Sequence, residues 1–153
     1  MPATPRHPSV RRPDDRHRSW RIPFVLLLVL LVAPPLLAQG KTLASGQWTK
    51  KGFDIEGSWS IVEDGGRRFV VLDDAFRTKS APDLKIFLSS RPAQEISSLD
   101  ATRGAVRVGP LASNKGAQRL EIPAGVDLGS HPTLVLHCEQ YSKLWGVATI
   151  RLR

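Results

Sequence analysis

The chain has 153 residues, of which 41% are hydrophobic and 7% aromatic, and it contains one cysteine. This length fits one domain. A single cysteine excludes an intramolecular disulfide and any zinc or iron–sulfur site built from several thiolates. The formal net charge is +8, from 22 Lys and Arg against 14 Asp and Glu. Where these charges lie decides whether they indicate nucleic-acid binding.

The N-terminus has the layout of a secretory signal. Residues 1–22 contain six arginines and two aspartates, and ten uninterrupted apolar residues follow at 24–33. Two prolines come next, and Ala38 marks a plausible cleavage point. The alternative is an uncleaved membrane anchor over residues 22–38, although a bilayer span needs about 20 apolar residues. We therefore expect an exported protein of the periplasm, cell envelope or medium, with membrane contact only through this segment if it is retained.

The sequence divides into a signal peptide or anchor at residues 1–38, a polar linker at 39–51 and one domain at 52–153. Residues 39–153 carry 16 Lys and Arg against 12 Asp and Glu, with no charge run longer than two. This distribution is typical of a solvated surface. Basic and aromatic residues are not interleaved in the stripe that binds phosphates and stacks on bases, so we expect no nucleic-acid binding.

From residue 52 onward, hydrophobic residues recur with period two, and Gly, Pro, Asp or Asn interrupts them about every ten residues. This pattern predicts an all-β fold, an antiparallel β-sandwich of about seven or eight short strands. The clearest element is a hairpin in which a strand containing residues 58–61 turns at Asp64-Gly65-Gly66 and returns over residues 67–72. A further predicted strand begins at residue 84. Four more are predicted over residues 106–111, 117–122, 133–139 and 144–152. Residues 91–103 are predicted to form a long loop or a short helical turn.

Cys138 is the sharpest candidate for chemistry. It alternates with Leu134 and Leu136 on an apolar strand face, where a free cysteine packs like a small hydrophobic residue. However, an unpaired thiol in an oxidising compartment also suggests intermolecular pairing or a reactive role. His137 is a neighbouring cation of the kind that stabilises a thiolate. Because consecutive strand residues point to opposite faces, His137 is not expected to act as the base unless a bulge re-aims it.

The sequence gives less support for a metal or haem site than for a reactive thiol. No C-x-x-C-H attachment motif is present, and no histidine pair has zinc spacing. Haem or metal ligation at Cys138 remains a minor alternative, and the sequence requires no cofactor. Asp83 is a further candidate because its carboxylate suits a hard cation, as do those of Asp73 and Asp74. Capping of a turn is the more common role of such aspartates.

Three stretches together carry a resemblance to a known family. The first stretch reads FVVLDDAF at 69–76 and APDLKIFLS at 81–89. The second stretch has GPL at 109–111, NKGAQ at 114–118 and IP at 122–123. The third stretch is LVLHCEQYSKLWGVATI at 134–150. They resemble the DM-thirteen domain, a small β domain found beside DOMON modules and described as an electron-transfer domain. The family's characteristic cysteine falls on Cys138. Three positions depart from the family pattern, namely Ala81 for Gly, Leu120 for an aromatic residue and His137 for Trp.

The resemblance implies a DOMON-like β-sandwich and a redox role for Cys138, with Asp83 and His137 as further site candidates. Under this hypothesis Cys138 forms a mixed disulfide, a sulfenic acid or a one-electron oxidised state with a partner protein, and the thiol should be accessible. With no second cysteine, any resolving group belongs to another molecule, so we do not expect a stand-alone enzyme.

Two alternatives remain open. In a non-redox extracytoplasmic binding or adhesion module, loops 91–103 and 123–132 would contact a sugar or protein partner, and Cys138 would be an inert core residue. An exposed Trp48 or Trp145 would favour that hypothesis, because aromatic platforms suit sugars and interfaces. A structural protein without a ligand is the third possibility.

Overall fold

A computed structural model describes residues 40–153. The predicted signal helix within residues 1–38 lies outside this range. The described chain is all-β apart from one short 3-10 helix, η1 (Ala93–Glu95). Within residues 40–153, no helix is long and apolar enough to cross a lipid bilayer. The predicted all-β fold with antiparallel strands is confirmed.

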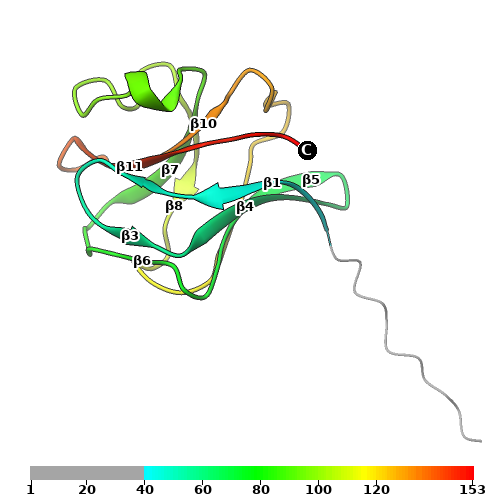
Figure 1. The fold of residues 1–153 in the computed structure, drawn as a ribbon, viewed down its shortest axis with the longest axis horizontal. Coiled ribbons are helices and arrows are strands. Elements are labelled where there is room, and N and C mark those ends of the chain that lie inside the picture. The colour runs from blue at the N-terminus through cyan, green and yellow to red at the C-terminus, as the bar shows by residue number, and fades with distance from the viewer. Residues whose placement is uncertain (1–39) are drawn as a thin grey trace, which may run out of the picture. The chain divides into compact units, whose positions relative to one another are not determined.

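Two antiparallel sheets build the sandwich, and a two-stranded sheet accompanies them (Figure 1). The first sheet has the order β1 (Lys41–Gln47), β4 (Ser58–Asp64), β5 (Arg67–Leu72), β9 (Gln118–Glu121). The second sheet has the order β2 (Thr49–Lys50), β11 (Lys143–Thr149), β10 (Thr133–Cys138), β7 (Leu84–Ser89), β8 (Val106–Pro110). The small sheet pairs β3 (Ile55–Glu56) with β6 (Arg77–Thr78).

The predicted hairpin of β4 and β5 is confirmed. The two strands pair from Asp64↔Arg67 to Trp59↔Leu72. Gly65 and Gly66 both have positive φ, +57° and +75°, as the tight two-residue turn that suits twisted strands requires. Residues 91–103, predicted as a long loop or a short helical turn, form a loop that contains the three-residue helix η1.

The prediction of a linker at residues 39–51 is wrong. β1 pairs with β4 from Lys41 to Gln47, and β2 pairs with β11. Ala44 is the fully buried residue of β1, whereas most of its neighbours are exposed. An edge strand with small and polar side chains carries little hydrophobic periodicity, so the pattern of the sequence resembled a linker.

Two buried clusters stabilise the fold. The inner cluster lies between the sheets, and its fully buried members include Ile61, Val70, Leu72, Ile86, Leu88, Leu134 and Leu136. A second cluster lies on the opposite face of the second sheet, beneath η1 and its loop, and contains Phe87, Ile96, Ala101, Val135, Leu144 and Val147. In Figure 1, η1 and its loop lie beyond β10 and β11, on the side away from β3 and β6. As a result, all six residues of β10 are buried.

A β-bulge breaks the alternation of β11. The pairing of β10 with β11 shifts from Leu136↔Gly146 to His137↔Leu144, which leaves Trp145 as the extra residue. Leu144 therefore belongs to the second cluster, whereas Trp145 and Ala148 belong to the inner one. The prediction that every second residue of 144–152 shares one face is wrong, because strict period two does not survive a bulge.

Candidate functional site

Cys138 ends β10 at the margin of the inner cluster. Its side chain is 0% exposed, and its cross-strand partners are Leu84 on β7 and Lys143 on β11. The thiol is free and forms no disulfide bond within the chain. The structure therefore lacks the accessible thiol that disulfide exchange with a partner requires. Any chemistry at Cys138 has to act through the surrounding side chains or after local opening.

His137 lies on the opposite face of β10, as predicted. Its ring packs edge-on against Phe87, with ring centroids 6.3 Å apart at 81°. The imidazole is 5% exposed, and its Nδ1 has no hydrogen-bond partner among residues 40–153. Burial lowers the pKa of His137 below its ordinary value of 6.5, and the charge of Glu139 opposes this shift only in part. A neutral His137 on the far face is not placed to act as the base for Cys138.

Asp83 belongs to an ion cluster that fixes the same strand end. Lys85 Nζ lies 2.8 Å from Asp83 Oδ1 and also pairs with Glu139. Hydrogen bonds to Asp83 first, and to Glu139 second, raise the pKa of Lys85. Arg107 reaches Glu139 from β8 at 2.7 Å, and the Glu139 amide donates to the Asp83 carbonyl at 3.1 Å. The cluster thus ties β7 and β8 to the chain just after Cys138.

An aromatic pair lies at the bulge of β11. Trp145 is 3% exposed and belongs to the same buried cluster as Cys138. Its ring centroid lies 4.2 Å from that of Phe53, with the planes tilted by 42°. The backbone amides of Lys51, Gly52 and Phe53 all point at the Trp145 carbonyl, at 3.0, 2.9 and 3.4 Å. These contacts hold the loop that follows β2 over the bulge.

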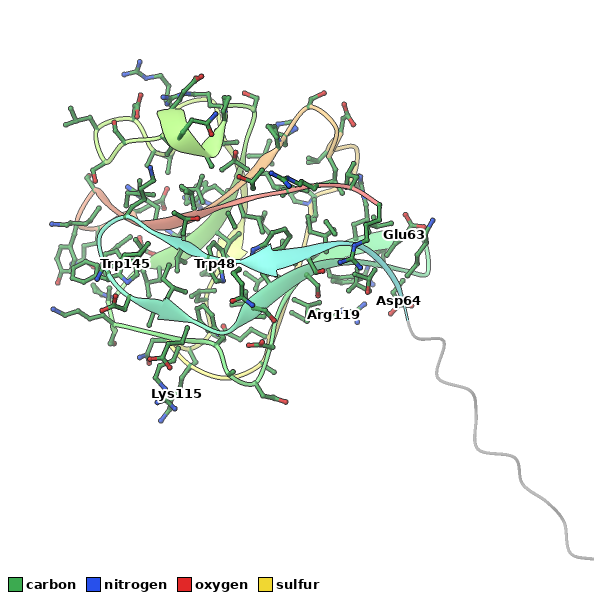
Figure 2. All side chains as sticks on the ribbon, in the orientation of Figure 1. Trp48, Glu63, Asp64, Lys115, Arg119 and Trp145 are labelled. Carbon is green, nitrogen blue, oxygen red and sulfur yellow. The ribbon has the colours of Figure 1, made fainter. Side chains whose placement is uncertain are left out.

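Neither tryptophan of interest forms an exposed platform. Trp48 is partly buried and Trp145 is buried, and the indole Nε1 of each lacks a hydrogen-bond partner among residues 40–153. Figure 2 shows Trp145 at the end of the domain opposite Glu63 and Asp64. The aromatic surface that would have favoured a sugar-binding module is therefore not present at these two positions.

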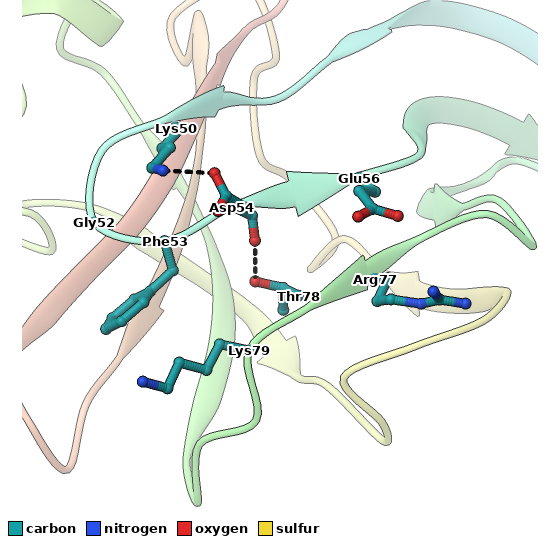
Figure 3. Close-up of a pocket in the computed structure, with 8 residues that line it drawn as sticks. All are labelled: Lys50, Gly52, Phe53, Asp54, Glu56, Arg77, Thr78 and Lys79. Carbon is teal, nitrogen blue, oxygen red and sulfur yellow. Dashed lines mark hydrogen bonds and ion pairs between the residues drawn. The ribbon is translucent and has the colours of Figure 1, made fainter.

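Two pockets flank this end of the sandwich. One, of about 360 Å³, is lined by the aromatic ring of Phe53 together with charged residues of the 50–56 and 77–79 segments (Figure 3). The other, of about 340 Å³, lies between residues 80–84 and 110–114. Leu84 lines this second pocket and is also the cross-strand partner of Cys138. The sequence pattern gave no signal for either pocket, because their walls come from separate loops.

Two of the three aspartates considered as cation ligands, Asp73 and Asp83, have structural partners. Asp73 Oδ2 accepts hydrogen bonds from the amide and hydroxyl of Ser58, at 2.8 and 2.6 Å. The hydroxyl bond is the main reason that the pKa of Asp73 is lowered. Within residues 40–153, His, Cys, Asp and Glu side chains form no group of three or more that could hold a metal ion.

Comparison with known proteins identifies one family. The family model described as Electron transfer DM13 matches residues 47–150, well over half of the chain. The matched region contains Cys138, His137 and Asp83, and it begins at the last residue of β1. No curated protein and no solved structure matched the chain.

Proposed function

Because the chain belongs to the electron transfer DM13 family, we propose that it is an exported electron-transfer domain that exchanges electrons with a redox partner protein. Cys138 is the proposed redox group. The observation that carries this assignment is the position of Cys138, in one buried cluster with Trp145, whose ring contacts the partly exposed Phe53.

The burial of Cys138 distinguishes between the redox mechanisms. Disulfide exchange and sulfenic acid formation need another atom to reach Sγ, which a fully buried thiol prevents. An electron can tunnel through a few ångströms of packed protein without contact at the sulfur. Burial therefore favours a one-electron step. Oxidation of Cys138 removes one electron, which a haem or metal centre of the partner takes up. It also removes one proton, which passes to water at the strand end. Reduction reverses both transfers.

Oxidation by ferricyanide tests the role of Cys138. We expect one ferricyanide to be reduced to ferrocyanide per wild-type chain and none by Cys138→Ala. Alkylation should label Cys138 rapidly only after denaturation. Equal consumption of ferricyanide by wild type and Cys138→Ala would overturn the assignment.

Export is the second part of the proposal, and it is supported by the basic, apolar and small-residue order of residues 1–38. A reporter enzyme fused after residue 51 should be active outside the cytoplasm. A mature N-terminus at Gln39 would establish cleavage, whereas an intact chain in the membrane fraction would establish an anchor at residues 22–38. A reporter that stays in the cytoplasm would contradict export.

A non-redox binding module is the second candidate function. The specific observation in its favour is that Cys138 is 0% exposed within an apolar cluster, as a structural cysteine would be. The ferricyanide experiment separates the two candidates. Absence of electron transfer from the native wild-type chain would favour the binding module.

A further inference from the structure

Cationic side chains lie near Phe53 and along the adjoining pocket, at the end of the domain that holds Cys138. The ammonium groups of Lys79 and Lys143 lie 5.0 and 5.8 Å from the centre of the Phe53 ring. Arg77 lines the same pocket (Figure 3). All three cations are exposed, and none forms an ion pair with a residue of the 40–153 range. We call Phe53, Arg77, Lys79 and Lys143 the basic rim.

The acidic side chains of this pocket do not balance the basic rim. Asp54 is paired with Lys50 at 2.5 Å, which leaves Glu56 as the remaining carboxylate of the lining. The three exposed cations of the basic rim therefore outnumber Glu56, which is the cross-strand neighbour of Arg77 and forms no ion pair within residues 40–153. Because like charges repel one another, these neighbouring cations are unfavourable in the isolated domain. Binding of an anionic partner would relieve the repulsion.

Two residues of the basic rim, Lys143 and Phe53, connect it to the surroundings of Cys138. Lys143 is the cross-strand neighbour of Cys138, and directly paired residues of antiparallel strands have Cα atoms about 4.5 to 5.5 Å apart. Phe53 contacts Trp145, which shares the buried cluster of Cys138. The positive surface therefore adjoins an aromatic pair that reaches into the buried cluster of the thiol.

We propose that the basic rim is the docking surface for an acidic face of the redox partner, and that electrons pass between Cys138 and this partner through Trp145 and Phe53. The proposal rests on the function proposed above. Complementary charge would raise the association rate and orient the partner's redox centre toward Phe53. The partner is accordingly a protein with a one-electron centre beneath a carboxylate-rich surface.

Binding can be tested apart from electron transfer. Hexacyanochromate(III) is a paramagnetic trianion that is inert as an oxidant under these conditions, so it reports where an anion settles. In NMR spectra of the full-length chain, it should broaden amide signals of Phe53, Lys79 and Lys143 at lower concentration than those elsewhere. The double variant Lys79→Glu/Lys143→Glu should abolish this preference. Broadening that is uniform, or centred elsewhere, would overturn the docking surface.

Kinetics test the electron route. Ferricyanide, an anion, should oxidise the wild type faster than a tris(phenanthroline)cobalt(III) cation of matched driving force. Lys79→Glu/Lys143→Glu should slow the ferricyanide reaction about 10-fold or more at low salt, and high salt should reduce the difference. The neutral variant Lys79→Gln/Lys143→Gln should give a smaller decrease.

The matched control is Lys41→Glu/Arg151→Glu, which changes the net charge equally. Lys41 is the cross-strand neighbour of Glu63, which Figure 2 places at the opposite end from Trp145. Arg151 is exposed and lies two residues before Arg153, whose amide donates to the Leu43 carbonyl of β1. An equal loss of rate in this control would contradict the docking surface. If neither reagent oxidises the wild type, the proposed function fails. If both do so without any dependence on the basic rim, the function stands and the docking surface fails.

Discussion

The side chains of His137 and Cys138 occupy two different buried environments, although the residues are adjacent in sequence. Cys138 belongs to the inner cluster between the sheets, whereas His137 packs against Phe87 beneath the η1 loop. The second sheet is therefore covered on both faces at the same strand. Each face can be perturbed separately, because a change at one residue leaves the packing of the other in place.

Protonation of His137 should destabilise the fold. Burial lowers the pKa of His137 in the folded state below 6.5, so the unfolded chain binds its proton first as the pH falls. The free energy of unfolding should thus be fully retained above pH 6.5 and decrease below it, until the folded-state pKa is passed. Urea unfolding of wild type between pH 7.5 and 5 measures this slope.

The matched variants for this experiment are His137→Phe and His131→Gln. His137→Phe keeps an aromatic ring against Phe87 and removes the titrating group, so its acid slope should be flatter than that of wild type. His131→Gln alters the other histidine of the domain, which lies in the loop before β10, and should retain the slope. An unchanged slope in His137→Phe would assign the acid sensitivity to other groups.

Cys138→Ser should destabilise the domain more than Cys138→Ala. Both remove sulfur from a site with 0% exposure, but serine also buries a hydroxyl in an apolar cluster, which costs about 1 to 3 kcal/mol when unpaired. Guanidinium unfolding at pH 7 gives the comparison. Equal midpoints, or a more stable Ser variant, would mean that a polar group near Sγ accepts the hydroxyl proton.

Gly57→Ala should be much more damaging than Gly65→Ala. Both glycines have positive φ, +81° and +57°. A Cβ on Gly57 would come within 2.5 Å of both Asp73 Oδ1 and the Phe76 amide nitrogen, whereas a Cβ on Gly65 would meet nothing within 4 Å. Gly65→Ala should cost about 1 kcal/mol for the left-handed backbone, and Gly57→Ala should cost several-fold more because the β5–β6 turn must move. Similar melting temperatures for the two variants would contradict this account.

The central strands of the fold were predictable from sequence, because their buried side chains are large and alternate. Trp59, Ile61 and Leu72 carry that signal in β4 and β5. β1 was not predictable, since its main buried side chain is Ala44 and its pairing depends on backbone hydrogen bonds. The bulge at Trp145 was equally hidden, because a register shift is set by both partner strands.

The candidate site was predictable only in part. The alternation of Leu134, Leu136 and Cys138 correctly predicted which face of the sheet the thiol occupies. The accessibility of the thiol could not be predicted, because it depends on which loops cover the sheet. The contact of Phe53 with Trp145 joins residues more than 90 positions apart. No periodicity within one strand carries information about such a contact.

The ion cluster of Asp83, Lys85 and Glu139 should control how often Cys138 becomes accessible. It joins the start of β7 to the residue after Cys138, so its loss should favour local opening of this strand end rather than global unfolding. We expect Glu139→Gln to raise the rate of native-state alkylation of Cys138 several-fold. The control Glu121→Gln weakens the exposed pair with Arg67 in the other sheet and should leave the rate unchanged. Equal acceleration in both variants would show that alkylation follows global unfolding, and no change in Glu139→Gln would show that the cluster does not hold this strand end closed.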